Sequence, residues 1–433
     1  MSEFQSGKDA LAAFSVRTPD SKAYISAKKT PSMKLDDTCS QIDMRALRAY
    51  RLRRLQSELR ARDYGAALLF DPINVRYATG SRNMTVWLLH NPARYCLVPA
   101  DGIPVLFEYG NKNCRRLTDG LETIGEVRTA IGCQYFYAAE HMADVCRAFA
   151  LDLADALKGV AGASKRIAVD KIDPAPARAL EALGIELFDG QEPCEQARAI
   201  KGPEEIACMT VAVAACDVGM ARMREALQPG ITENRLWAEL HHANIALGGE
   251  WIETRLLSSG GRTNPWFQES SERMIRPGDL VSFDTDLIGP YGYCADLSRT
   301  FYCGPGRSTG EQRTLYGLAY EQLCSNLELL RPDISFDELR ERAWQVPARF
   351  DAQKYSSIYH GVGLCDEWPA ISYAGSGRRT QGGVVASGMV LCVESYIGEE
   401  NGAEGVKLEE QVLITEQGPQ ILSTFPFEQS LLE

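Results

Sequence analysis

One stretch of the chain, residues 280–301, places three carboxylates in an otherwise apolar segment, LVSFDTDLIGPYGYCADLSRTF. Two strand-like runs flank a Gly-Pro-Tyr-Gly turn, so the segment predicts a β-hairpin with its strands side by side. Asp284 and Asp286 are two residues apart, which puts both side chains on one face of a strand. Asp296 can return to that face from the partner strand. Buried carboxylates without a partner are costly, so the hairpin predicts a bound cation, most simply a metal ion. The alternative is a solvated sheet face carrying three exposed acids.

Three further residues in the second half of the chain extend this prediction. His360 stands in YHGVGLCDEWP, and the two glycines after it let a backbone approach closely; Glu394 and Glu409 lie in the apolar runs GMVLCVES and GVKLEEQVLIT. A structural histidine and surface-facing strand acids are the alternatives. An oxygen-rich set with one imidazole suits Mn, Fe, Co or Zn and excludes a purely thiolate site. Because five negative charges exceed what one divalent ion offsets, we expect two metal ions bridged by carboxylates. The six predicted ligands are Asp284, Asp286, Asp296, His360, Glu394 and Glu409.

Length and composition restrict the class of protein. The 433 residues are enough for two or three domains, and an apolar share of 45% is typical of a soluble protein with a core. A net charge of −12 argues against a nucleic-acid partner. The chain has no run of 18 apolar residues and no secretory signal pattern, so we expect neither a membrane span nor export. The 13 cysteines form no CxxC pair, which indicates free thiols and a cytoplasmic location. Five of them are expected to fill the core: Cys208, Cys216, Cys294, Cys365 and Cys392.

The chain divides into three parts. Residues 1–42 are polar and predict a loosely held N-terminal arm. Residues 43–199 predict a small α/β domain without a Gly-rich phosphate loop. Its expected elements are helices at 43–62, 139–158 and 174–184, strands at 65–71 and 165–170, and a hairpin at 95–110.

The segment RAIKGPEE at 198–205 marks the boundary of the third part, residues 200–433. Gly202-Pro203 followed by two acids is a typical start of a helix. Helices beside a curved, mostly antiparallel sheet predict an α+β domain. We expect helices at 203–227, 233–247, 310–330 and 335–350, and strands at 251–258, 280–302, 388–396 and 406–415.

The order Asp, Asp, His, Glu, Glu after RAIKGPEE resembles the pita-bread superfamily of methionine aminopeptidases, prolidases and creatinases. The resemblance covers about residues 44–425 and implies a creatinase-like N-terminal domain before a pita-bread catalytic domain. It places the five metal ligands of that superfamily on Asp286, Asp296, His360, Glu394 and Glu409. The spacing between the two aspartates is one residue shorter than in the peptidases.

The resemblance fails at three positions that matter for peptide cleavage. Peptidases of this fold carry extra histidines around the metal ions, and this chain has Trp266, Ser356 and Glu367 in their places. The metal ligands are kept while the peptide-cleaving groups are lost, which indicates a different reaction.

Longer motifs are similar to one branch of the superfamily, the DddP-type dimethylsulfoniopropionate lyases. These motifs are GGEWIETRLL, RTNPWFQE, SFDTDLIG, AQKY and HGVGLCDEWP. The resemblance implies that Asp284 is a further metal ligand and that Asp366 is the catalytic base. It also places Tyr355, and Trp87 of NMTVW, at the active site. A turn-capping role for Asp366 remains the alternative, and its neighbour Glu367 could face the same side.

The resemblance implies a metal-dependent lyase that cleaves dimethylsulfoniopropionate, a small zwitterionic sulfonium compound, to dimethyl sulfide and acrylate. A sulfonium group has no proton to donate, so aromatic faces are the expected way to hold it. The resemblance also implies two metal ions, with iron expected first and zinc or manganese as alternatives, and a homodimer. The candidate aromatic faces, which could instead be core residues, are Trp87, Trp266, Tyr355, Trp368 and Phe267.

Two other functions stay open from the sequence. The shared fold and ligands suit an Xaa-Pro aminopeptidase or prolidase, and the same fold also serves as a non-catalytic binding module. Residues 375–387 fit the family pattern poorly, and the pair Arg378-Arg379 within them could contact an anionic substrate or be solvated.

Overall fold

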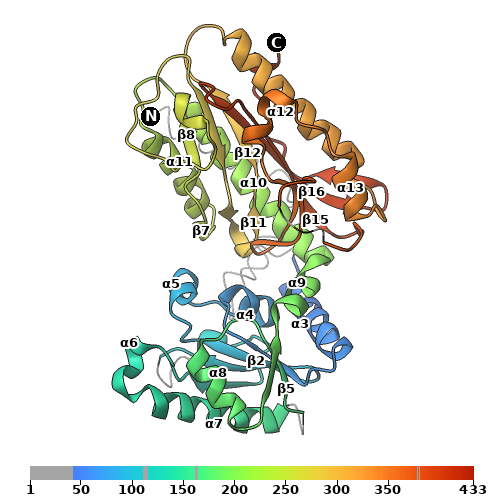
Figure 1. Ribbon diagram of the computed structural model, residues 1–433. Helices are drawn as coiled ribbons and strands as arrows, with labels where there is room; N and C mark the ends of the chain where they lie inside the picture. Colours follow the sequence, from blue (N-terminus) through green and yellow to red (C-terminus); the bar gives the residue numbers. More distant parts are fainter. Residues whose placement is uncertain (1–41, 111–115, 161–163, 378, 380) are drawn as a thin grey trace, which may run out of the picture. The chain divides into compact units, whose positions relative to one another are not determined.

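The computed structural model describes residues 42–110, 116–160, 164–377, 379 and 381–433 (Figure 1). Contacts divide them into two compact units, one at Asp43–Arg198 and one that runs from Ala199 to Glu433. The predicted arm at 1–42 lies outside the described residues except for its last residue, and so does Arg378.

The first unit is built on a mixed six-stranded sheet with the order β4-β3-β2-β1-β5-β6. The predicted hairpin is present as the antiparallel pair β2–β3, while β1, β5 and β6 run parallel. The strands are β1 Ala66–Leu69, β2 Tyr95–Pro99, β3 Val105–Glu108, β4 Glu126–Thr129, β5 Arg166–Val169 and β6 Glu186–Asp189. The helices are α3 Met44–Ala61, α4 Pro72–Thr79, α5 Thr85–His90, α6 Tyr135–Ala138, α7 Met142–Val160, α8 Pro174–Glu181 and α9 Gln191–Ala199.

Local sequence explains where these elements begin. The Asp43 carboxylate accepts hydrogen bonds from the backbone N–H groups of Arg45 and Ala46 and so caps α3. Pro72 and Pro174 occupy the first turns of α4 and α8, where the missing N–H costs nothing. The apolar face of α7 packs on the sheet, and both contribute to one buried cluster.

The second unit begins with two long helices, α10 Pro203–Ala226 and α11 Glu233–Ala246. Pro203 starts α10, and the hydroxyl of Thr232 caps α11 by accepting from the N–H of Arg235. By length and composition alone α10 could cross a membrane, and half of its most apolar window is buried inside the protein. The other helices are α12 Gly310–Leu329, α13 Phe336–Arg342 and α14 Gln429–Leu432.

Three antiparallel sheets complete the second unit: β14-β13-β15-β16-β17, β12-β9-β8 and β11-β10-β7. The predicted closing strands correspond to β15 and β16, which pair along their length. The strands are β7 Trp251–Ile252, β8 Leu257–Ser259, β9 Leu280–Asp284, β10 Leu287–Ile288, β11 Cys294–Ala295, β12 Ser298–Tyr302, β13 Ser357–Val362, β14 Asp366–Ser372, β15 Val390–Gly398, β16 Gly405–Thr415 and β17 Gly418–Ile421.

The helix predicted at 335–350 is wrong in length, because α13 ends at Arg342 and a separate 3₁₀ turn spans Ala348–Gln353, after the helix-breaking Pro347.

All cysteines among the described residues are free, and most are buried. Of the five named core cysteines, Cys365 is only partly buried.

Candidate metal centre

The acidic hairpin is interrupted between its first two aspartates. Strand β9 ends at Asp284, opposite Ser298 of β12, and Asp286 takes a left-handed backbone conformation with φ of 34°. Thr285 bridges the gap: its hydroxyl donates to the carbonyl of Ala295 (2.9 Å) and accepts from the N–H of Leu297 (3.0 Å). The expectation of one regular strand through both aspartates is therefore wrong. Their carboxylates nevertheless come together as expected, with ligand atoms within 4.8 Å of each other.

The imidazole of His360 projects from β13 toward three carboxylates. Its Nδ1 lies 3.2 Å from the carbonyl of Gly361, which leaves Nε2 as the nitrogen available for a ligand. Oxygen atoms of Glu394, Asp296 and Glu409 lie 3.3, 3.5 and 3.8 Å from Nε2. The strands β13, β15 and β16 and the Asp296 loop thus converge on one point.

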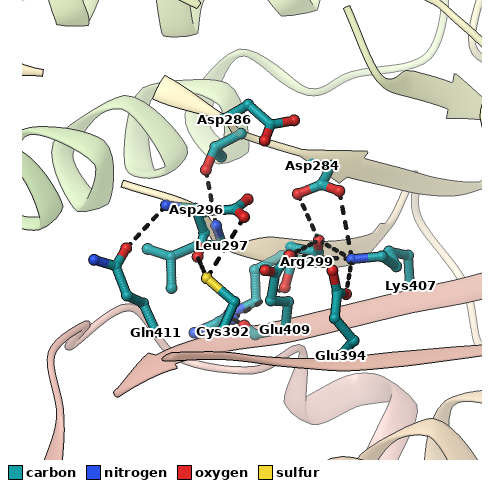
Figure 2. Close-up of polar contacts among 12 residues, drawn as sticks. Asp284, Asp286, Asp296, Leu297, Arg299, Cys392, Glu394, Lys407, Glu409 and Gln411 are labelled. Carbon is teal, nitrogen blue, oxygen red and sulfur yellow. Dashed lines mark hydrogen bonds and ion pairs between the residues drawn. The ribbon is translucent and has the colours of Figure 1, made fainter. Parts of the chain in front are cut away.

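Five of the six predicted ligands fall into two overlapping groups that share Asp296, and the sixth, Glu394, contacts His360 at 3.3 Å. Ligand atoms of Asp296, His360, Cys392 and Glu409 lie within 4.8 Å of one another, and so do those of Asp284, Asp286 and Asp296. Figure 2 shows the carboxylates facing each other across the gap between β9 and the strands β15 and β16. Each group has the size of a single-ion site.

The carboxylates of this cluster are buried and only partly paired within the described residues. Oδ1 of Asp296 and Oε1 of Glu409 are buried without a hydrogen-bond partner among the described residues. Burial, reinforced by the neighbouring carboxylates, raises the pKa of Asp286 and of Asp296 well above the usual range. Ionised carboxylates buried so close together are strongly destabilising unless cations pair with them. Oxygen atoms without a partner and an oxygen-rich donor set fit the two-ion site that the sequence predicts.

Lys407, which was not predicted from the sequence as a site residue, lies inside the cluster. Its side chain is fully buried, and Nζ donates to Glu394 Oε2 (2.5 Å), Ser298 Oγ (2.7 Å) and Glu409 Oε2 (3.1 Å). Burial lowers the pKa of a lysine, but the carboxylates of Asp284, Glu394 and Glu409 outweigh it and raise the pKa of Lys407 well above its usual value. The sequence feature that points to Lys407 is its position two residues before Glu409, because alternate residues share one face of a strand.

Asp366 and Glu367 are neighbours in β14 with opposite surroundings. The side chain of Asp366 is 57% exposed, and its Oδ1 lies 3.7 Å from Nδ1 of His360. Glu367 is fully buried and forms an ion pair with Lys201, which is also buried. Asp366 therefore lies beside the carboxylate cluster, whereas Glu367 pairs with Lys201.

The candidate aromatic residues separate into three environments. The rings of Trp266 and Tyr355 lie 5.8 and 5.3 Å from the Lys407 ammonium, and Phe267, which is 63% exposed, contacts the Tyr355 ring at 5.5 Å. Trp368 instead packs against Phe336 of α13 and the hydrophobic core. Trp87 belongs to the first unit, where its ring contacts Tyr109.

Cys392 was expected only to fill the core, and the structure gives it a second property. It is buried, but its Sγ lies 3.5 Å from Oδ2 of Asp296 and within the first ligand group. A strand position two residues before Glu394 puts both side chains on the face that carries His360.

Family models cover most of the chain. Residues 51–200 match the creatinase/prolidase N-terminal domain, and residues 207–416 match metallopeptidase family M24. The fold is also that of a solved Xaa-Pro dipeptidase from Bacillus anthracis, with a TM-score of 0.70, 19% identity and coverage of 88% of this chain and 99% of the other. At this identity the likeness speaks for the fold alone.

Two curated relatives are far more similar in sequence. A protein from Roseovarius nubinhibens, named dimethylsulfoniopropionate lyase DddP, is 44% identical over 90% of this chain and 88% of its own length. A protein of the same name from Roseobacter denitrificans is 42% identical over the same shares.

Proposed function

Because this chain belongs to the family of DddP dimethylsulfoniopropionate lyases, on the M24 metallopeptidase fold, we propose that it cleaves dimethylsulfoniopropionate to dimethyl sulfide and acrylate. One observation of the site supports this most directly. Asp366 lies exposed beside His360 at the edge of the carboxylate cluster, where a base can reach a bound substrate. A base of this kind is needed to remove a proton from carbon.

The reaction needs a proton acceptor and an electron sink. Two ions held by the six predicted ligands would supply Lewis acidity toward the substrate carboxylate. Asp366 takes the proton from the carbon next to that carboxylate. The electron pair of this C–H bond becomes the new C=C bond, the C–S bond breaks with its electrons on sulfur, and neutral dimethyl sulfide leaves. Acrylate and a protonated Asp366 remain, so atoms and charges balance.

The direct test is the product analysis of the purified protein. With dimethylsulfoniopropionate we expect dimethyl sulfide in the headspace and acrylate in solution in equal amounts. Heat-inactivated protein at the same concentration is the control for spontaneous elimination. Hydroxypropionate in place of acrylate would contradict a β-elimination.

Aromatic side chains are proposed to hold the sulfonium group. Trp266 and Tyr355 lie together near the cluster, and Phe267 extends this group to the surface. An aromatic face contributes about 0.5–2 kcal/mol to a cation. Trp87 and Trp368 stay predicted contacts, although core packing explains the surroundings of Trp368.

Tyr355 gives a test of this aromatic contact. Replacing Tyr355 by Phe keeps the ring, so we expect KM for dimethylsulfoniopropionate to stay within about threefold. Tyr355→Leu removes it and should raise KM about 2- to 30-fold above the KM of Tyr355→Phe, the range that corresponds to one cation–π contact. Steady-state kinetics measure both, and equal KM values for the two variants would contradict the contact.

The peptidase alternative has less support. Two of the three positions that carry histidines in the peptidases are occupied by groups with other partners: Glu367 pairs with Lys201, and Trp266 lies over Lys407. Neither group can shuttle a proton to a peptide nitrogen as a histidine would. A binding module would leave the orphaned oxygen atoms of Asp296 and Glu409 without a purpose.

We also propose the identity of the metal, the oligomeric state and the cellular location. We propose iron as the metal, because carboxylate and imidazole ligands suit it, with zinc or manganese as alternatives. Elemental analysis of protein purified without added metal salts tests this. A homodimer, a cytoplasmic location, and the lack of nucleic-acid or membrane partners are proposed from the family resemblance and the composition.

A further inference from the structure

We propose that Lys407 is a built-in cation of the metal centre that weakens binding of a metal ion at the group formed by Asp284, Asp286 and Asp296. This inference rests on the proposed metal dependence, but it concerns the affinity for ions and not the reaction. It assigns a role to a fully buried lysine that contacts the acids of this site.

The contacts of Lys407 are directed to one side of the cluster. Its Nζ lies 2.5 Å from Glu394 Oε2, 3.1 Å from Glu409 Oε2 and 3.4 Å from Asp284 Oδ2. Figure 2 shows Lys407 reaching toward these carboxylates. The hydroxyl of Ser298 also contacts Lys407, Asp284 and Glu409. The ammonium therefore already contacts the acids that incoming ions must use.

The opposite oxygen atoms of the same glutamates face the imidazole. Oε1 of Glu394 and Oε1 of Glu409 lie 3.3 and 3.8 Å from Nε2 of His360. Beside His360, each glutamate thus offers one oxygen atom for which no contact with Lys407 is described. Beside Asp284 the oxygen atoms are already engaged. Ser298 and Lys407 contact the two oxygen atoms of Asp284, and both also contact Oε2 of Glu409.

The positive charge of Lys407 should also weaken the binding of a metal ion beside Asp284. An ammonium buried among the ligands repels an arriving cation, and this repulsion is weakly screened in a buried site. The five carboxylates and Lys407 together leave four negative charges, the amount that two divalent ions neutralise. Without the ammonium, one negative charge would remain in excess and would draw cations more strongly.

The test counts bound Mn²⁺ in wild-type protein and in the Lys407→Met variant. Manganese-loaded protein is dialysed against a series of chelator-buffered Mn²⁺ concentrations, and the metal content is measured by elemental analysis. We expect wild-type protein to release one ion at a higher free Mn²⁺ concentration than the other. In Lys407→Met, the affinity for this weaker ion should rise about tenfold or more.

Two variants make the result specific to the charge. Lys407→Arg keeps a cation and should keep the weak second ion. Lys201→Met removes another buried lysine of this unit, whose described partners are Glu367 and the carbonyl of Ala199, and should leave Mn²⁺ affinity unchanged. Because the experiment starts from manganese-loaded protein, it does not require the metal-free Lys407→Met variant to fold.

An unchanged or weakened second ion in Lys407→Met would overturn the inference, because the lysine would then support the ligands instead of competing with the ion. Product analysis with dimethylsulfoniopropionate is scored separately. If Mn²⁺ binding changes as expected but no dimethyl sulfide forms, the proposed function fails and this inference stands.

Discussion

Asp366→Asn is expected to lose lyase activity while keeping its metal ions. The variant preserves the shape of the side chain but cannot accept a proton from carbon. A general base contributes about 100- to 10,000-fold to a rate, so kcat for dimethylsulfoniopropionate should fall within that range with little change in KM. The side chain is more than half exposed, so the fold should tolerate the change.

Metal analysis and a second aspartate separate this effect from general damage. Elemental analysis should find the same metal content in Asp366→Asn as in wild-type protein. The exposed Asp337 of α13 provides the matched control, and Asp337→Asn should retain full activity. Wild-type kcat in a metal-replete Asp366→Asn protein would exclude Asp366 as the base.

Glu409→Gln is expected to lose both metal and activity. Glu409 is fully buried, its Oε1 is orphaned, and it lies within reach of His360 and Asp296. An amide cannot replace the negative charge that offsets two cations. Changes to groups that only support metal ligands already cost about 10–100-fold, so loss of a ligand should cost at least roughly 100-fold in kcat/KM.

The next residue on the same strand offers the matched control. Glu410 is also buried, but it points to the other face of β16 and pairs with Arg299 at 2.5 Å. Glu410→Gln should lower thermal stability, because it weakens a buried ion pair, and should leave metal content unchanged. Equal metal contents in the two variants, measured by elemental analysis, would refute the assignment of Glu409 as a ligand.

The sequence was enough for the elements that carry the site. Local rules predict them well: Thr232 and Pro203 mark helix starts, and alternation and apolar runs mark β15 and β16 around Glu394 and Glu409. The convergence of Asp296, His360 and Glu409 could be proposed because unpaired acids in apolar strands need a partner.

Other features depend on contacts between distant segments and could not be predicted. The strand break at Asp286 is held by Thr285 against Ala295 and Leu297. The ion pair between Lys201 and Glu367 joins residues 166 positions apart. The packing of Trp368 against α13 likewise follows from tertiary structure and not from its motif.

The orientation of the Lys407 side chain could not be predicted from the sequence for a different reason. Its spacing from Glu409 was visible, but a lysine on a strand usually points to solvent. Only the registry of β15 and β16, which pairs Lys407 with Tyr396 and Glu409 with Glu394, shows that all of them face the cluster.

The central claim is that the metal ligands of a peptidase fold here serve a carbon–sulfur lyase. One preparation of purified, metal-analysed protein should be assayed in parallel with dimethylsulfoniopropionate and with an Xaa-Pro dipeptide. We predict that kcat/KM for dimethyl sulfide release exceeds that for proline release by at least roughly 1,000-fold, because no histidine replaces the peptidase groups at Trp266, Ser356 and Glu367. Proline release without dimethyl sulfide would contradict the account.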